Sequence, residues 1–217
     1  MSQPILDDGL VTGNVYDKYG TRNPIARWMV GGFLDAFRDL AQSSGADRAL
    51  EAGCGEGRLS LELARLGMRV RASDVSPKII DIARRTVAAE SAGDEVATAI
   101  ELEVRSLFEL TPARDAAPLV VCCEVLEHVD EPERALDVLA SLASPHLLVS
   151  VPREPLWRVL NMARGRYLRD FGNTPGHVQH WSRRGFLDLL ERRVEVVAVR
   201  SPLPWTMALC RTQGDGA

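Results

Sequence analysis

Two glutamates and a histidine stand close together directly after an apolar run of the chain. The run is residues 119–123, and Glu124, Glu127 and His128 follow it. If the turn after the run is helical, these three side chains fall at positions i, i+3 and i+4 and share one face. The pattern therefore places three side chains of metal-ligand type in one direction.

Two of the four histidines, His177 and His180, come later in the chain. Two carboxylates and two imidazoles can hold a divalent cation, since oxygen ligands suit magnesium or manganese and imidazoles admit zinc or iron. Without a metal, His128 is the best candidate general base, because its ordinary pKa lies near the working pH. The alternative is that the glutamates are helix N-terminal acids favoured by the helix dipole, with the later histidines on a polar loop.

Three glycines at alternate positions form a second candidate site. Gly53, Gly55 and Gly57 follow a short apolar run that ends in Glu51, and a helical pattern begins at once. Glycines let the backbone turn sharply and let a nucleotide-like ligand approach it. A dinucleotide fingerprint needs a third small residue where Arg58 stands, and a phosphate-binding P-loop needs Lys-Ser/Thr after the turn. The sequence disfavours both of those ligands.

The run from Glu51 to Gly57 resembles motif I of the class I S-adenosylmethionine-dependent methyltransferases. A second predicted strand ends in Asp74, about 20 residues beyond the first glycine, where a carboxylate can accept hydrogen bonds from both ribose hydroxyls. The resemblance implies S-adenosyl-L-methionine as the cofactor. It assigns to cofactor binding Glu51, Gly53, Cys54, Gly55, Asp74, Val75, Ser106, Leu107 and Cys123.

One segment departs from the family pattern. After the third strand these enzymes usually place an acidic residue that meets the adenine amino group, and this chain has Arg105-Ser106-Leu107 there. Ser106 can still bond the adenine edge, while Leu107 or Phe108 packs on its face. The alternative is an ordinary polar turn.

The run Glu124-Val-Leu-Glu-His128 is similar to that of many small-molecule methyltransferases, including the O-methyltransferases of ubiquinone biosynthesis. The small-RNA 3′-terminal 2′-O-methyltransferases also resemble this chain here, and they bind a cation through Glu-x-x-Glu-His and a histidine shortly before Trp-Thr/Ser. His177, four residues before Trp181, matches that later histidine. The resemblance implies a metal set of Glu124, Glu127, His128 and His177, with His128 and Glu127 as the catalytic candidates.

Helical and strand patterns alternate along the chain, which predicts a parallel sheet covered by helices. We expect an α/β fold with a Rossmann-like, seven-stranded methyltransferase sheet, helices on both faces, an N-terminal helix and a cap inserted after strand 5. The predicted strands are residues 48–52, 68–73, 97–104, 119–123, 147–151, 194–199 and 203–211. The predicted helices are residues 24–43, 58–66, 77–89, 132–143 and 182–192.

The expected organisation is an N-terminal arm and helix over 1–44, a methyltransferase domain over 45–211 and a disordered tail over 212–217. Tyr16 or Tyr19 of the arm lines the cofactor site, or the arm docks on the surface. Within the domain, residues 153–181 are predicted to cap the substrate opening. Seven arginines between Arg153 and Arg184 would suit an anionic acceptor, or form a solvated helix face.

Composition narrows the functional class. The 217 residues are 46% hydrophobic, and no apolar stretch approaches the length of a membrane span. A net charge of −4 argues against general nucleic-acid binding. The N-terminus shows no secretory signal, and four cysteines form no disulfide framework, so we expect a cytoplasmic protein with reduced thiols.

These patterns predict transfer of a methyl group from S-adenosyl-L-methionine to a small-molecule acceptor, with a hydroxyl favoured. An RNA 2′-O-methyltransferase is the alternative within the class. A non-catalytic nucleotide-binding module and an NAD-dependent oxidoreductase are alternatives outside it. The sequence does not set the acceptor, the metal or the oligomeric state.

Overall fold

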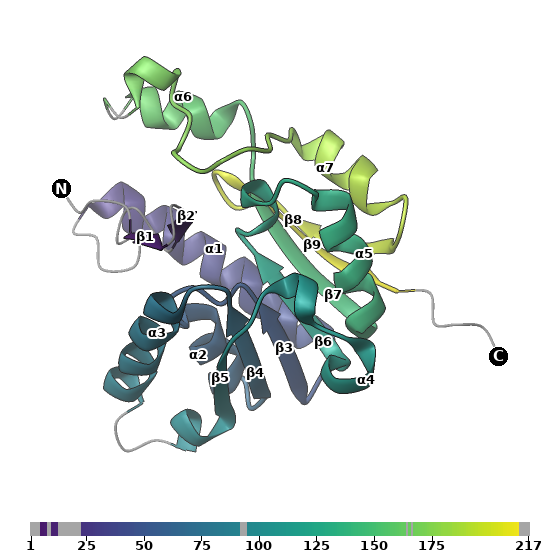
Figure 1. Cartoon of the computed structure of the whole chain (residues 1–217). Coiled ribbons are helices and arrows are strands. Elements are labelled where there is room, and N and C mark those ends of the chain that lie inside the picture. The colour runs from purple at the N-terminus through teal and green to yellow at the C-terminus, as the bar shows by residue number, and fades with distance from the viewer. Residues whose placement is uncertain are drawn as a thin grey trace.

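The computed structural model describes residues 5–7, 10–12, 23–91, 95–163, 165 and 167–212. In this part of the chain a seven-stranded sheet has the order β5-β4-β3-β6-β7-β9-β8 (Figure 1). The strands are β3 (Arg48–Ala52), β4 (Arg69–Asp74), β5 (Ile100–Val104), β6 (Ala117–Cys123), β7 (Ala143–Pro152), β8 (Glu195–Arg200) and β9 (Trp205–Arg211). β3 to β7 pair in parallel, and β9 runs antiparallel between β7 and β8. The predicted methyltransferase sheet with its C-terminal hairpin is confirmed.

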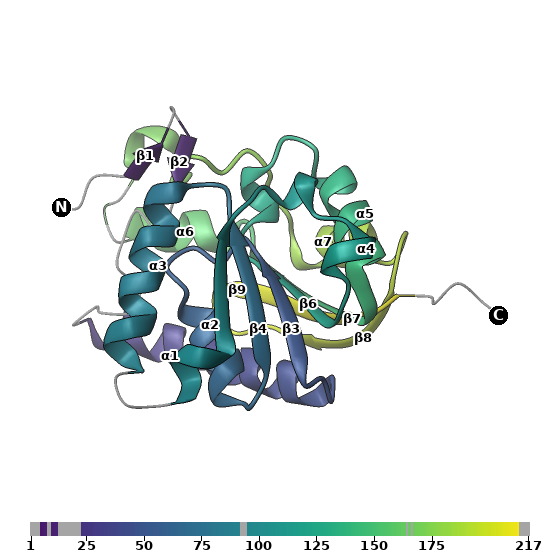
Figure 2. The same ribbon diagram turned by 60° about the horizontal axis from the view of Figure 1, so that its bottom comes forward.

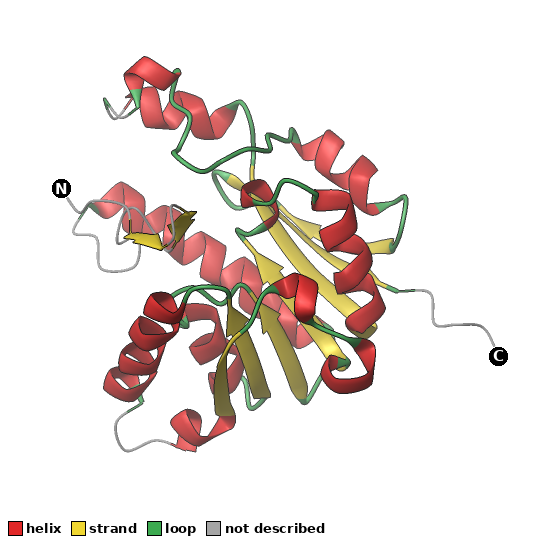
Figure 3. Cartoon of the chain, in the orientation of Figure 1, coloured by secondary structure: helices red, strands yellow, loops and turns green. Residues whose placement is uncertain are grey.

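Helices cover both faces of the sheet, as Figures 2 and 3 show. One apolar core lies between the sheet and α1 (Pro24–Ser43), α2 (Arg58–Arg65) and α3 (Pro77–Glu90). The opposite core lies under α5 (Pro132–Leu142) and α7 (Arg183–Leu190), with the short α4 (Pro112–Asp115) beside α5. The central strand β6 is buried along nearly its whole length, as its continuous apolar run predicts.

Short 3₁₀ turns join several of these elements. They are η1 (Glu95–Ala99), η2 (Leu107–Glu109), η3 (Leu126–His128) and η4 (Leu168–Asp170). The first of them corrects the predicted third strand, which begins at Ile100 and not at residue 97. The predicted loop around residue 93 lies outside the described residues.

The helix α1 begins where the sequence predicts. The side chain of Asn23 accepts hydrogen bonds from the N–H groups of residues 25 and 26, and Pro24 occupies the first helical position. Two large apolar side chains in the first two turns of α1 do not pack in the core. Ile25 is 66% exposed and Trp28 is 67% exposed. The helix packs against the sheet core from Met29 onward.

The N-terminal arm contributes a two-stranded antiparallel sheet, β1 (Ile5–Asp7) and β2 (Leu10–Thr12), which the sequence did not predict. Tyr16 and Tyr19 lie outside the described residues, as does most of the predicted tail. No helix among the described residues combines the length and the apolarity needed to cross a membrane.

The segment after β7 leaves the sheet and returns to it. It carries α6 (Leu156–Ala163), which lies beyond the carboxyl ends of the parallel strands (Figure 1). Its two ends meet, because Arg153 and Trp181 form a β-bridge and the N–H of Glu154 donates to the Trp181 carbonyl over 2.9 Å. We call residues 153–181 the cap.

Candidate active site

A cavity of about 550 Å³ lies at the carboxyl ends of β3, β4 and β6. Open α/β sheets bind their ligands at this edge. The cavity is bounded by the glycine turn, the first turns of α1, the turns η2 and η3, and the cap. The residues assigned by resemblance to the cofactor or to a cation all line it: Glu51, Gly53, Cys54, Gly55, Asp74, Val75, Ser106, Leu107, Cys123, Glu124, Glu127, His128 and His177.

The glycine turn requires glycine at two positions. Gly53 has φ +79°, and a Cβ added there would lie 2.4 Å from Cγ2 of Val125. Gly57 has φ +78°, begins α2 and would bring a Cβ to 3.3 Å from Cβ of Ala83. The N–H groups of Gly53 and Cys54 both donate to the Ser73 carbonyl, over 2.8 and 2.9 Å. These contacts fix a bare backbone loop against the cavity, as a ligand that approaches the main chain requires.

Two carboxyl groups flank this loop. Glu51, at the end of β3, is 2% exposed and accepts a hydrogen bond from the Ser60 hydroxyl. Burial raises the pKa of Glu51 to about 8, the Ser60 bond opposes this increase, and the charge of Asp74 adds to it. Asp74, at the end of β4, accepts from the N–H groups of Gly55 (3.1 Å) and Ser76 (3.0 Å). Burial also raises the pKa of Asp74, against those backbone bonds. A ligand with a cationic group and hydroxyl donors would satisfy both carboxyls.

In the segment that departs from the family pattern, Arg105 is paired with Asp115. The guanidinium of Arg105 donates to both oxygens of Asp115, over 3.0 and 2.8 Å. Although burial alone would raise it, the pKa of Asp115 falls to about 2, chiefly through the Arg105 bond and the Thr111 N–H. Sequence reasoning missed Asp115, because α4 was not predicted. Ser106 caps η2 and, with Leu107, faces the cavity.

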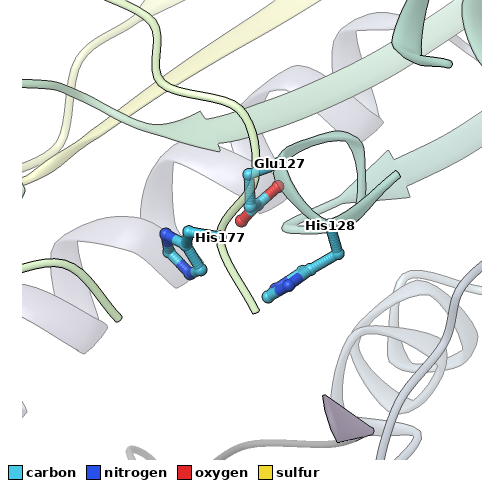
Figure 4. A group of neighbouring side chains, drawn as sticks. All are labelled: Glu127, His128 and His177. Carbon is cyan, nitrogen blue, oxygen red and sulfur yellow. The ribbon is translucent and has the colours of Figure 1, made fainter. Parts of the chain in front are cut away.

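Glu127, His128 and His177 converge on one space (Figure 4). Each offers a ligand-type atom, and these atoms lie within 4.8 Å of one another. The imidazole rings meet edge to face, with centroids 4.8 Å apart. The cap loop is held in place by the N–H groups of Val178 and Gln179, which both donate to the Glu127 carbonyl. The structure thus unites three of the four predicted metal-binding residues.

One hydrogen bond defines the protonation of His128. Its Nδ1 lies 2.9 Å from the carbonyl oxygen of Gly176, and a carbonyl oxygen only accepts. Nδ1 therefore carries the proton, and the lone pair of the neutral ring is on Nε2. This tautomer suits both a general base and a metal ligand.

The fourth predicted ligand, Glu124, is absent from this group, which corrects the expected helix from 124 to 128. Glu124 has φ +61°, and helical geometry begins only at η3. The left-handed residue turns its side chain toward the sheet, where it accepts from Oγ of Ser150 (3.1 Å) and Nε1 of Trp205 (2.6 Å). His180 is also outside the group, with its Nε2 2.8 Å from Oδ1 of Asn173.

Aromatic rings line the cavity beside the acid and imidazole group. Trp205 lies between Phe33 and Trp157, at centroid distances of 5.0 and 5.8 Å. Trp157 stacks on His177 at 6.0 Å. Trp205 was not predicted for the site, and the antiparallel register brings it opposite Pro152, at the carboxyl end of β7. We call Phe33, Trp157 and Trp205 the aromatic wall.

Two further aromatic residues of the cap differ in their surroundings. Tyr167 lines the cavity, whereas Trp181 packs on Phe186 of the core, 5.9 Å between centroids. The cap is braced by Thr174, whose hydroxyl accepts from Nε1 of Trp157 (2.9 Å) and Nδ2 of Asn161 (3.2 Å).

The described arginines in and directly after the cap contact groups outside the cavity. Among the described side chains of residues 153–184, no arginine lines the cavity. Arg158 donates to the Phe171 carbonyl, Arg183 to the Ser201 hydroxyl, and Arg184 pairs with Asp188. These contacts favour the interpretation as a solvated face.

The cavity contains no activated thiol among its described residues. Cys54 and Cys123 line it as free cysteines, and burial raises the pKa of both thiols well above the usual value. A thiolate nucleophile is therefore disfavoured. The oxygen and nitrogen atoms of Glu127, His128 and His177, which lie within 4.8 Å of one another, are suited to moving a proton or holding a cation.

Comparison with known proteins agrees with this geometry. Residues 26–193 match the sequence model of a family described as "Methyltransferase domain". The chain is 32% identical over 177 residues to a ubiquinone biosynthesis O-methyltransferase of Cupriavidus pinatubonensis, covering 75% of this chain and 67% of the relative. It is 33% identical over 136 residues to the protein of the same name in Xylella fastidiosa, covering 62% of this chain and 52% of that one. The chain thus spans about half the length of several curated relatives that it matches.

The fold also matches solved structures. Magnesium protoporphyrin IX methyltransferase from Synechocystis PCC 6803, crystallised with bound SAH, aligns with a TM-score of 0.67. That alignment covers 89% of this chain and 90% of the other, at 20% identity. At this identity the likeness supports the fold.

Proposed function

Because this chain belongs to the family of methyltransferase domains, we propose that it transfers the methyl group of S-adenosyl-L-methionine to a hydroxyl group of a small-molecule acceptor. One observation carries the proposal. The cavity that contains the glycine turn and Asp74 also contains Glu127, His128 and His177. A cofactor at the turn and an acceptor at the acid and imidazole group would share one enclosed space.

The cofactor is proposed to lie across the ends of β3 and β4. Its ribose hydroxyls would donate to Asp74, and its ammonium group would face Glu51 across the bare backbone at Gly53. The adenine would reach Ser106 and Leu107, with Cys54, Gly55, Val75 and Cys123 completing the walls. The cavity supports this placement, because all of these residues line it.

The acceptor is proposed to lie beneath the cap, against the aromatic wall. Trp157 and Trp205 line this part of the cavity, and although only 4% of Trp205 is exposed, their aromatic rings suit a planar acceptor. Neither Arg153 nor Arg158, the cap arginines whose side chains the structure describes, lines this space. The hydroxyl would point to the acid and imidazole group, because Trp157 stacks on His177.

Methyl transfer needs an aligned and deprotonated oxygen. The acceptor oxygen bonds to the methyl carbon while the bond from carbon to sulfur breaks, and sulfur leaves with the electron pair as a neutral thioether. The hydroxyl proton passes to Nε2 of His128, which the Gly176 contact keeps in the correct tautomer. Glu127 stabilises the imidazolium that forms.

A divalent cation is a second way to prepare the oxygen. One carboxylate and two imidazoles within 4.8 Å fit such an ion, and Glu127, His128 and His177 would hold it. A bound cation would lower the pKa of a coordinated hydroxyl. In that case Nε2 of His128 is a ligand and not a base, so chelation distinguishes the two roles.

A cytoplasmic location belongs to the same proposal. All four cysteines are free, as expected in a reducing compartment. Transfer to an RNA 2′-hydroxyl would use the same acid and imidazole group, but the net charge of −4 disfavours it.

The test is calorimetric titration of chelator-treated protein with S-adenosylhomocysteine, followed by titration with Mg²⁺, Mn²⁺ or Zn²⁺. We expect the product to bind without metal. Methylation of catechol, assayed with and without chelator, then tests the hydroxyl acceptor, since its planar ring fits the aromatic wall. Absence of product binding under every condition would overturn the proposal, whereas binding without turnover of any hydroxyl acceptor would favour a non-catalytic module.

A further inference from the structure

Glu124 occupies a backbone conformation that a residue with a side chain rarely adopts. Its φ of +61° lies in the left-handed region, directly at the end of β6. Such conformations persist where surrounding contacts hold them, and they gather at functional sites. The contacts that hold Glu124 are its backbone N–H, which donates to the Ser150 carbonyl over 3.0 Å, and its carboxylate.

Both carboxylate oxygens of Glu124 accept a hydrogen bond. Oε1 accepts from the Ser150 hydroxyl and Oε2 from the Trp205 indole, which donates over a short 2.6 Å. An indole N–H can only donate, so its partner must be an acceptor. A carboxylate meets this need with a charge-assisted bond, which is stronger than a neutral one.

The Trp205 ring links this bond to the acceptor space. It is 4% exposed and contacts Phe33 on α1 and Trp157 on the cap. Trp157 in turn stacks on His177. Glu124 thus fixes the position of the Trp205 indole. That position determines how Phe33 and Trp157 are arranged in the aromatic wall, beside the acid and imidazole group.

We propose that Glu124 is a positioning residue that anchors Trp205, and so determines the shape of the acceptor site, rather than a ligand of a cation. The inference rests on the proposed function, because the wall selects an acceptor only if the acceptor binds there. It reassigns the first glutamate of the Glu-x-x-Glu-His run. The second glutamate, Glu127, remains with the histidines.

The test uses three variants of Glu124. Glu124→Gly removes the carboxylate and suits a φ of +61°, so the fold is retained. Glu124→Gln keeps one amide oxygen for the indole, while its NH₂ can donate to the Ser150 hydroxyl, which can also accept. Glu124→Ala removes the carboxylate and keeps the backbone strain. Trp205→Phe identifies the indole signal of Trp205 among the four tryptophans.

The readout is the ¹⁵N–¹H spectrum of the indole groups, with solvent exchange of each N–H. In Glu124→Gly and Glu124→Ala we expect the Trp205 indole to exchange about tenfold faster, as loss of a hydrogen bond to a charged group predicts. The Trp157 signal should shift as well, because its ring contacts that of Trp205. In Glu124→Gln both indole signals should remain as in the wild type.

Unchanged indole signals in Glu124→Gly would overturn the proposal. An equal loss of Mn²⁺ affinity in Glu124→Gln and in Glu127→Gln would also overturn it, because such a loss would show that Glu124 ligates the cation as Glu127 does. If the wild type binds no Mn²⁺, Glu124 is not a ligand. Changes of the indole signals in the Glu124 variants then support its role as the residue that anchors Trp205. S-adenosylhomocysteine titration of the wild type tests the proposed function separately, because the indole spectrum needs no ligand.

Discussion

The carbonyl oxygen of Gly176 lies 2.9 Å from Nδ1 of His128, although 48 residues separate the two in the chain. The contact joins the turn after β6 to the cap. It places the cap backbone in control of the histidine tautomer, and it makes the cap part of the acid and imidazole group as well as a cover over it.

Replacement of His128 tests this role. His128→Ala should lower kcat by about 10²- to 10⁴-fold, the usual contribution of a general base, whether proton transfer or cation binding is lost. Affinity for S-adenosylhomocysteine should stay within about twofold, because the residues proposed to hold the cofactor lie on other turns. Steady-state kinetics and calorimetry measure the two effects. An equal loss in both would show that His128 supports the structure and not the reaction.

A methyl group at Gly53 should damage the cofactor site. The added Cβ would lie 2.4 Å from Val125 at a φ of +79°, so Gly53→Ala should lower the free energy of unfolding by about 1–3 kcal/mol and abolish product binding. Gly31→Ala is the matched control. Gly31 lies inside α1 with no atom within 4 Å of the added Cβ, so this change should stabilise the protein by about 0.5–1 kcal/mol. Urea unfolding and product titration of both variants give the comparison, and tight product binding by Gly53→Ala would contradict the assignment.

The pKa of Glu51 predicts a specific pH dependence. It is raised from 4.5 to about 8 in the folded protein, so between these values the folded chain holds a proton that the unfolded chain has lost. The contribution of Glu51 to stability is therefore complete below pH 4.5 and lost as the pH rises through 8. Relative to Glu51→Gln, the wild type should lose free energy of unfolding on the order of 4 kcal/mol across this range. Urea unfolding of both proteins from about pH 4 to 9 measures the difference. A difference that does not change with pH would show that the carboxyl titrates normally.

The hydroxyl of Thr174 braces the cap, since it accepts from both Trp157 and Asn161. Thr174→Val removes this acceptor with little change in volume, so Nε1 of Trp157 loses its bond to Thr174 whereas Nδ2 of Asn161 keeps its bond to the Gly172 carbonyl. We expect the acceptor KM to rise about tenfold, while affinity for S-adenosylhomocysteine is unchanged. Limited proteolysis should also cleave residues 153–181 faster in the variant. Thr174→Ser, which keeps the acceptor oxygen, should behave as the wild type, and failure of this rescue would assign the effect to packing.

Local signals predicted most of the fold. Asn23 followed by proline placed the start of α1, and Ser76 with Pro77 placed the start of α3, because a capping side chain satisfies helix N–H groups wherever it stands. The alternation of strands and helices predicted the sheet, and the carboxyl ends of its parallel strands predicted where the site residues would meet.

The errors arose where distant segments decide the outcome. Helical spacing alone grouped Glu124 with Glu127, whereas the donors Ser150 and Trp205 draw Glu124 toward the sheet. Trp205 itself carries no local signal for a site. Only the antiparallel register of β9 against β7 brings it to the cavity. The spacing of residues within one segment gives no information about which distant strand that segment pairs with.

The β-bridge between Arg153 and Trp181 holds the two ends of the cap together. A segment whose two ends are already paired can change in length or sequence with little effect on the sheet that carries it, because the entropy of closing a loop grows slowly with its length. We therefore expect that this segment can be exchanged while the cofactor half of the cavity is preserved, provided that the replacement keeps His177 and the Gly176 carbonyl. In a chimaeric protein with the cap of another sequence, the junctions should be placed at residues 153 and 181.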